Sequence, residues 1–194
     1  VARLWYIAGV SECRTPPSAP RAASRAQTRQ HQGDPMSELF KFLLDPQTAV
    51  VFDIDGVLAV YEFGTHCHSA CPDEDWETYV RTHDPYASTH PVPQIQRFVR
   101  AKGPERVYAC SVAADFEAPG KRDFVLAHYG IAPDHIRLVE RKPQKMDFLQ
   151  GVADDLALPR DRVALVEDTV KTLDAACEKG FSTVHVTSFF GFEA

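Results

Sequence analysis

Short apolar runs alternate with amphipathic stretches over most of the chain. Runs rich in β-branched residues predict buried strands, and apolar residues recurring every three to four positions predict helices. Strands are expected at residues 49–53, 106–111, 135–139, 162–166 and 182–186. Helices are expected at residues 37–44, 73–81, 92–101, 118–129, 145–158 and 169–179. This alternation is typical of βαβ units. The sequence therefore predicts an α/β fold: a doubly wound (Rossmann-like) parallel sheet of about five strands flanked by helices.

Residues 1–35 do not follow this alternation. They contain five Arg, and residues 14–33 have no acid and are rich in Ala, Ser, Pro and Gln, a composition typical of disordered chains. Three interpretations stay open: a disordered leader, an Arg- and Ser-rich transit peptide, or a non-native upstream extension of a chain whose translation starts at Met36. We favour the last, because an amphipathic stretch begins directly after Met36. We therefore expect one folded domain at residues 36–194.

Composition limits the possible functions. The 194 residues carry a net charge of −6, and 44% are hydrophobic, which is enough for one packed domain. Residues 1–35 carry +3 and the remainder −9, which argues against nonspecific nucleic-acid binding as the main role. No apolar run approaches the ~20 residues of a membrane span. The five cysteines are odd in number and unevenly placed, so no disulfide framework is predicted. We expect a cytoplasmic protein without a membrane partner.

The first predicted strand ends in two acids separated by one residue, Asp53 and Asp55, and Gly56 follows them. Ligands of open α/β sheets bind outside the carboxyl ends of the strands, so these carboxylates indicate a site. Carboxylates this close repel each other, and an oxygen-rich site of this kind suits Mg²⁺. One Asp can attack a phosphoryl group, while the other protonates the leaving oxygen and later activates water. The plainer alternative is a solvated turn at a strand end.

Polar residues follow other predicted strands as well. Ser111 ends the second strand, Lys145 opens the helix after the third, and Asp168 follows the fourth. In a doubly wound sheet these positions lie along one edge. Asp53, Asp55 and Asp168 can together hold a hard cation. Ser111 can hydrogen-bond a phosphate oxygen, and Lys145 can neutralise charge as a phosphoryl group is transferred.

Four motifs in this order resemble those of the haloacid dehalogenase-like (HAD) hydrolases. They are Val-Phe-Asp-Ile-Asp-Gly-Val at 51–57, Tyr-Ala-Cys-Ser at 108–111, a Lys that opens a helix, and Val-Ala-Leu-Val-Glu-Asp-Thr at 163–169. The resemblance covers about residues 48–189. Each motif is weak alone, but all four on the expected strand–helix pattern are a strong signal.

The resemblance implies a role for each matching residue. Asp53 is the implied nucleophile, and Asp55 is the implied general acid/base, whose backbone carbonyl also ligates Mg²⁺. Ser111 and Lys145 are implied to bind the phosphoryl group, and Asp168 is implied to complete the metal site. Dehalogenases of this superfamily lack the second Asp of the first motif, so Asp55 favours phosphatase chemistry.

Some positions of the family pattern leave alternatives. Lys142 precedes a Pro, as the motif lysine does in other members, but we prefer Lys145, because it has the expected spacing before the acidic pair. Glu167 is expected to contribute to the metal site through water. Many members carry a further acid four residues after the motif Asp, and this chain has Thr172 there. Asp174 is expected on the helix surface.

In this family a cap domain lies after the first motif or between the second and third. Here residues 60–91 follow the first motif, so we predict a small cap insertion that begins as a flap and includes the helix near 73–81. Such a cap leaves the site open to larger substrates unless a partner subunit covers it. The candidates for substrate contact are His66, His68, Trp76 and Tyr79. For the two aromatic residues, packing of the cap helix onto the core is the alternative that we favour.

The cap segment also contains His and Cys residues at spacings that can bind Zn²⁺: His66, Cys67, His68 and Cys71. No second Cys/His pair lies nearby, although His83 and His90 can fold back toward them. We favour the alternative, a polar loop beside the active site.

The sequence thus predicts a Mg²⁺-dependent phosphomonoester hydrolase that works through an aspartyl-phosphate on Asp53. Its expected substrate is a phosphorylated small molecule or a larger phosphoester. One alternative is a non-catalytic, phospho-ligand-binding or regulatory protein of the same fold. The other is a phosphotransferase that passes the phosphoryl group to an acceptor other than water. The complete set of acids argues against a non-catalytic protein.

Overall fold

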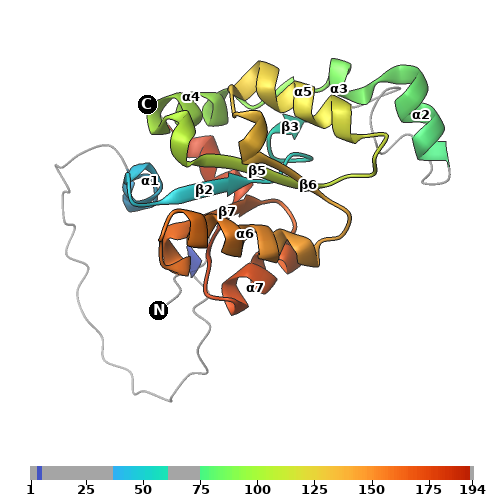
Figure 1. Ribbon diagram of the computed structural model, residues 1–194. Helices are drawn as coiled ribbons and strands as arrows, with labels where there is room; N and C mark the ends of the chain where they lie inside the picture. Colours follow the sequence, from blue (N-terminus) through green and yellow to red (C-terminus); the bar gives the residue numbers. More distant parts are fainter. Residues whose placement is uncertain (1–3, 6–36, 61–74, 193–194) are drawn as a thin grey trace, which may run out of the picture.

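The structure, a computed structural model, describes residues 4–5, 37–60 and 75–192. Its main sheet is parallel, with the strand order β1-β8-β7-β2-β5-β6 (Figure 1). Five strands closely match the predicted ones: β2 (Ala49–Phe52), β5 (Val107–Val112), β6 (Ile136–Val139), β7 (Val163–Glu167) and β8 (Ser182–His185). The predicted α/β fold with a doubly wound parallel sheet is therefore confirmed.

The remaining strand of the main sheet, β1 (Leu4–Trp5), pairs in parallel with β8 at Thr183 and Val184. We expected residues 1–35 to lie outside the fold, and for these two residues that expectation is wrong. The backbone groups of an edge strand, here β8, are free to pair with a further strand, so the short apolar run that begins at Leu4 can supply two residues to the sheet. The other residues of 1–35 lie outside the described part of the chain, and the origin of this segment stays a prediction.

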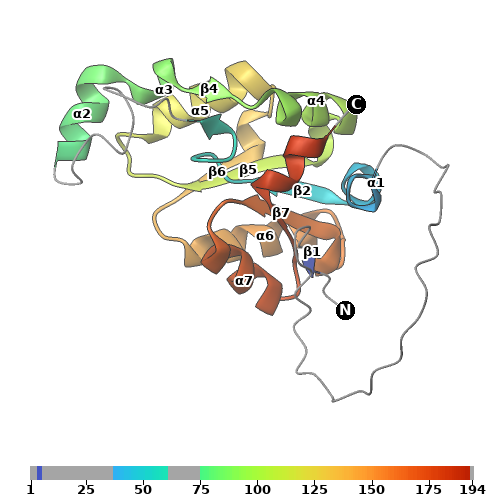
Figure 2. The ribbon, with the colours of Figure 1, turned by 180° about the vertical axis from the view of Figure 1, so that it is seen from behind.

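Helices cover both faces of the main sheet (Figures 1 and 2). α4 (Pro93–Lys102) and α5 (Ala118–Tyr129) lie on one face, and apolar residues of α1 (Glu38–Leu44) join the core there. α6 (Pro143–Asp155) and α7 (Val170–Glu178) cover the opposite face. Short 3₁₀ turns precede three strands and another follows the last: η3 (Pro104–Arg106), η4 (Pro133–His135), η5 (Arg160–Arg162) and η6 (Val186–Gly191).

The central strand β2 is apolar throughout, and its neighbour β7 is apolar up to Glu167, because both faces of these strands are buried. Along β2, Val50 and Phe52 join the core beneath α4 and α5, whereas Ala49 and Val51 join the core beneath α6 and α7. The same alternation continues along β5 and β7. Successive side chains of a strand point to opposite faces, so the position of a residue in the strand determines which helices its side chain meets. This rule decides the partners of the polar residues that follow each strand.

A second, smaller sheet lies next to the main one. β3 (Ala59–Val60) pairs antiparallel with β4 (His90–Pro91), which agrees with the predicted flap. α2 (Trp76–His83) and α3 (Pro85–Ser88) precede β4 in the chain. α2 contains no buried residue, and Tyr79 stacks between Trp76 and His83 on it. The two aromatic residues are half-buried, and the Trp76 indole N–H also donates to Glu117, at the start of α5, at 3.0 Å, so the favoured alternative, packing of the cap helix onto the core, stays a prediction.

The topology places the carboxyl end of β2 at a switch point of the sheet. The chain leaves β2 toward β5 and β6 on one side and then returns to β7 and β8 on the other. In open α/β sheets the crevice at such a point is where ligands bind. Within the described residues, no helix has the length and hydropathy needed to cross a bilayer.

Candidate active site

Asp53 leaves the sheet directly after β2. Its backbone N–H donates to the carbonyl of Val166 at 2.9 Å, and its Oδ1 accepts from the N–H of Ile54 at 2.8 Å. These bonds fix Asp53 at the carboxyl end of β2, where it is 7% exposed. Asp53 has the same strand parity as Val51, so its carboxylate lies on the α6 side of the sheet.

A tight loop follows Asp53 and reverses the chain. The Ile54 carbonyl accepts from the N–H groups of Val57, Leu58 and Ala59 at 3.2, 2.9 and 2.8 Å, and the N–H of Gly56 donates to the Ala59 carbonyl at 3.0 Å. Gly56 has φ +75°, a conformation that glycine adopts without strain. The loop carries Asp55 away from α6 and toward α3 and α5.

The Asp55 carboxylate is held at both oxygens. The Tyr86 hydroxyl donates to Oδ1 at 2.7 Å, and Oδ2 accepts from Lys121 Nζ at 2.7 Å and from the Ser111 hydroxyl at 3.2 Å. Ser111 and Lys121 are both 2% exposed, whereas about a third of the Asp55 side chain, 31%, is exposed. Asp55 therefore combines a fixed orientation with access to solvent.

Asp53 shares a buried cation with Glu167. Lys145 Nζ lies 3.0 Å from Asp53 Oδ1 and 2.8 Å from Glu167 Oε2. Burial alone would lower the pKa of Lys145, but the two carboxylates outweigh burial and raise it, so the ammonium stays charged. Burial, together with the negative charge of Asp53, raises the pKa of Glu167, and Lys145 opposes this shift. Two acidic side chains thus share one buried ammonium.

Asp168 adds a third carboxylate on the solvent side. Oxygen atoms of Asp53, Glu167 and Asp168 lie within 4.8 Å of one another. Thr169 Oγ1 donates to Asp168 Oδ1 at 3.1 Å. Carboxylate oxygens this close to one another are ligands that a hard divalent cation prefers, so these residues fit Mg²⁺. The side chain of Asp55 is turned away from this group, so only its backbone carbonyl is a candidate ligand.

Gly56 sets the approach of the loop to Asp168, because a Cβ at position 56 would lie 2.6 Å from Asp168 Oδ2. We expect Gly56→Ala to lower the free energy of unfolding by about 1–2 kcal/mol and to weaken Mg²⁺ binding. Gly130→Ala is the matched control, because Gly130 has φ +65° but a Cβ there would meet no atom within 4 Å. Urea unfolding and Mg²⁺ titration check both variants. Equal Mg²⁺ affinity of Gly56→Ala and Gly130→Ala would contradict the expected crowding of Asp168.

The structure brings the predicted site residues Asp53, Asp55, Ser111, Lys145 and Asp168 to one edge of the sheet. Their catalytic, phosphate-binding and metal-binding roles stay predictions. The alternative lysine, Lys142, is exposed at the start of α6. Thr172 is buried and Asp174 is exposed, as expected for a residue on the helix surface.

Two residues that hold Asp55 were not singled out from the sequence. Lys121 lies on the buried face of α5 with Phe124 and Val125, and a lysine at such an apolar position was a detectable signal. Tyr86 comes from the irregular segment before β4, where no periodicity marks it. The candidate zinc ligands His66, Cys67, His68 and Cys71 lie outside the described residues, as do residues 61–74 of the expected cap, so both alternatives for this segment stay open.

Cys110 lies next to Ser111 in the second motif and is fully buried. Burial raises the pKa of its thiol to about 12. The thiolate is the nucleophilic form of cysteine, so Cys110 is inert at neutral pH. Its role is packing, as its apolar surroundings in the sequence indicate.

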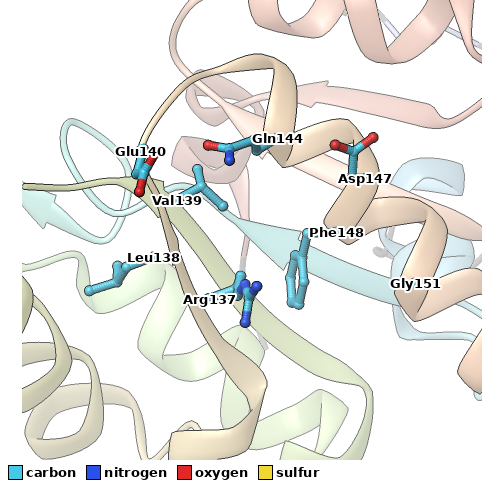
Figure 3. A pocket seen from close by; sticks show the side chains of 8 residues that line it. All are labelled: Arg137, Leu138, Val139, Glu140, Gln144, Asp147, Phe148 and Gly151. Atoms are coloured by element: carbon cyan, nitrogen blue, oxygen red, sulfur yellow. The ribbon is translucent and has the colours of Figure 1, made fainter.

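A separate hollow of about 430 Å³ lies between β6 and the first turns of α6 (Figure 3). Arg137 and Phe148 contribute to its wall from β6 and α6, respectively. Gln144 lines it, whereas its neighbour Lys145 is buried against Asp53. The hollow therefore does not include the acidic site.

Searches of known protein families and of curated proteins found no match. Solved structures that are similar include a HAD family hydrolase from Deinococcus radiodurans with bound phosphate and sodium, at 18% identity and a TM-score of 0.47, covering 72% of this chain and 80% of that one. A HAD family enzyme from Bacteroides thetaiotaomicron, in complex with magnesium and inorganic phosphate, has 12% identity and a TM-score of 0.47, with 71% and 93% covered. An uncharacterized protein from Corynebacterium glutamicum has 21% identity and a TM-score of 0.43, with 76% and 98% covered. At these values we infer function from the side chains of the site.

Proposed function

We propose that this protein is a Mg²⁺-dependent phosphomonoester hydrolase of the HAD type. The observation that carries the proposal is that two neighbouring acids, Asp53 and Asp55, have different surroundings. Asp53 lies against Lys145 beside the other acidic residues, whereas Asp55 is held apart by Tyr86, Lys121 and Ser111. Two carboxylates in different surroundings can perform different steps of one reaction.

In the proposed reaction, a carboxylate oxygen of Asp53 attacks the phosphorus of the substrate and forms an aspartyl-phosphate. The bond from phosphorus to the leaving oxygen breaks, and that oxygen takes a proton from the Asp55 carboxyl group. Asp55, now ionised, then takes a proton from the water that attacks the phosphorus. This second step releases inorganic phosphate and restores Asp53.

The other residues bind and neutralise the transferring group. Lys145 and the Ser111 hydroxyl lie beside Asp53 and Asp55 respectively, where each can donate to phosphoryl oxygens. Asp53, Asp168 and the backbone carbonyl of Asp55 are the proposed holders of Mg²⁺, with Glu167 acting through water. When bound, the cation neutralises phosphoryl oxygens and acts as a Lewis acid.

The test is hydrolysis of p-nitrophenyl phosphate by the full chain, with Mg²⁺ and with excess EDTA. We expect turnover that needs Mg²⁺ and returns when the metal is restored. No turnover by a folded protein, together with no turnover of a panel of phosphorylated metabolites, would contradict a hydrolase. Product that forms only when an acceptor alcohol is added would instead indicate a phosphotransferase.

A further inference from the structure

Of the two buried lysines among the described residues, Lys121 is the one that the proposed reaction does not use. It lies in the first turns of α5 and is 2% exposed, and its side chain extends to the carboxyl edge of the main sheet. Its Nζ donates to Asp55 Oδ2 at 2.7 Å and to the Val112 carbonyl at 2.5 Å. A buried ammonium is costly unless it is paired and hydrogen-bonded, so these contacts fix its position.

Glu117 is a second carboxylate near Lys121. Its Oε1 lies 3.8 Å from Lys121 Nζ and accepts from the indole N–H of Trp76 at 3.0 Å. Its Oε2 accepts from the N–H of Ala114 at 2.7 Å. Glu117 therefore ties Lys121 both to the loop that follows Ser111 and to α2, and the ammonium is held between two carboxylates.

Tyr86 holds the other oxygen of Asp55. The residue is 5% exposed, and its ring lies against α5 at Gly120, where a Cβ would come within 2.9 Å of the ring. A hydroxyl can both donate and accept a hydrogen bond, whereas an ammonium only donates. Lys121 therefore keeps Oδ2 as an acceptor, and Oδ1, beside Tyr86, is the oxygen that can exchange a proton.

We propose that Lys121 is a positioning residue that holds Asp55 for proton transfer to the leaving group. This inference rests on the proposed phosphohydrolase function. It deepens that function because it identifies which group orients the general acid. Without Lys121, Oδ2 loses its charged donor and the carboxyl group of Asp55 can rotate away from the leaving oxygen.

The test compares two substrates of nearly equal shape, p-nitrophenyl phosphate and phenyl phosphate. Nitrophenolate leaves without protonation, whereas the more basic phenolate depends on the general acid. In Lys121→Met we expect kcat/KM for phenyl phosphate to fall ~10²-fold and kcat/KM for p-nitrophenyl phosphate to fall less than ~10-fold. The ratio of kcat/KM is unaffected by a loss of folded protein, so a structural role alone would leave it unchanged.

Three further variants complete the design. Tyr86→Phe keeps the packing and removes the hydroxyl, and it should shift the ratio of the two kcat/KM values in the same direction. This variant provides the test if Lys121→Met fails to fold. Lys121→Arg keeps a donor and should restore part of the phenyl phosphate activity. Arg122→Met removes an exposed cation from the next position of α5 and should leave the ratio unchanged.

The contact itself is tested without turnover. In urea unfolding, the double variant Lys121→Met/Asp55→Asn should shift the midpoint by less than the sum of the shifts of the two single variants. Additive shifts, or an unchanged ratio of the two kcat/KM values in a folded and active Lys121→Met, would overturn the proposed role of Lys121. They would leave the proposed hydrolase function standing. A folded wild-type protein that hydrolyses neither ester would overturn the proposed function and this role together.

Discussion

Asp53→Asn is expected to lower the Mg²⁺-dependent hydrolysis of p-nitrophenyl phosphate by at least ~10³-fold. The amide keeps the shape of the side chain and can still accept from the Ile54 N–H, but it does not attack phosphorus. The replacement removes the attraction between Asp53 and Lys145, but it also removes the repulsion between Asp53 and Glu167. The fold should therefore persist, and circular dichroism and a urea titration check this beside the activity.

Asp174→Asn is the matched control for Asp53→Asn. Asp174 is an exposed acid of α7, and we expect its replacement to leave turnover at the wild-type level. A variant Asp53→Asn that keeps the wild-type rate would exclude Asp53 as the nucleophile. If the rate is lost, the nature of the step still needs its own measurement.

An aspartyl-phosphate can be distinguished from general-base attack by water. Rapid quenching of the wild-type protein with substrate should trap an acyl phosphate, which borohydride reduces at the carbonyl carbon. Peptide mapping should then locate the reduced residue at position 53. A reduced residue at another position would contradict the assignment of Asp53. The absence of any reduced residue under conditions of rapid turnover would indicate direct attack by water.

The strand ends could be predicted from the sequence because their positions depend on local pattern and on one topological rule. Asp53, Ser111 and Asp168 each follow an apolar run, and parallel strands bring their carboxyl ends to the same edge. Lys145 was detectable for a related reason. It lies on the same helix face as Leu149 and Val152, so the apolar face of α6 carries it inward to Asp53.

The surroundings of Asp55 could not be predicted in the same way. Tyr86 and Lys121 lie 31 and 66 positions further along the chain, and their contacts with Asp55 depend on how α3 and α5 pack. No local periodicity encodes such a contact. β1 escaped prediction for a different reason, because the apolar run at residues 4–8 is short and lies in a segment whose composition is typical of disordered chains.

Lys145→Met is expected to lower the free energy of unfolding by about 3 kcal/mol at neutral pH and in the absence of metal. The substitution leaves Asp53 and the buried Glu167, which is only 1% exposed, facing each other without their shared cation, and Lys145 no longer opposes the rise that burial and Asp53 cause in the pKa of Glu167. Removing one of these carboxylates as well should relieve part of the loss. In urea unfolding, Lys145→Met combined with Glu167→Gln should therefore be more stable than Lys145→Met alone.

Lys142→Met distinguishes the two candidate lysines of the third motif. Lys142 is exposed and precedes α6, so its replacement should change the free energy of unfolding by less than ~0.5 kcal/mol and leave turnover near that of the wild type. Lys145→Met, assayed with Mg²⁺ at a temperature where it is folded, should lose ~10²-fold in kcat/KM, because among the described residues Lys145 is the ammonium that pairs with Asp53. The reverse result, an active Lys145→Met and an inactive Lys142→Met, would assign phosphate binding to Lys142. It would also mean that the start of α6 turns toward the site when substrate binds.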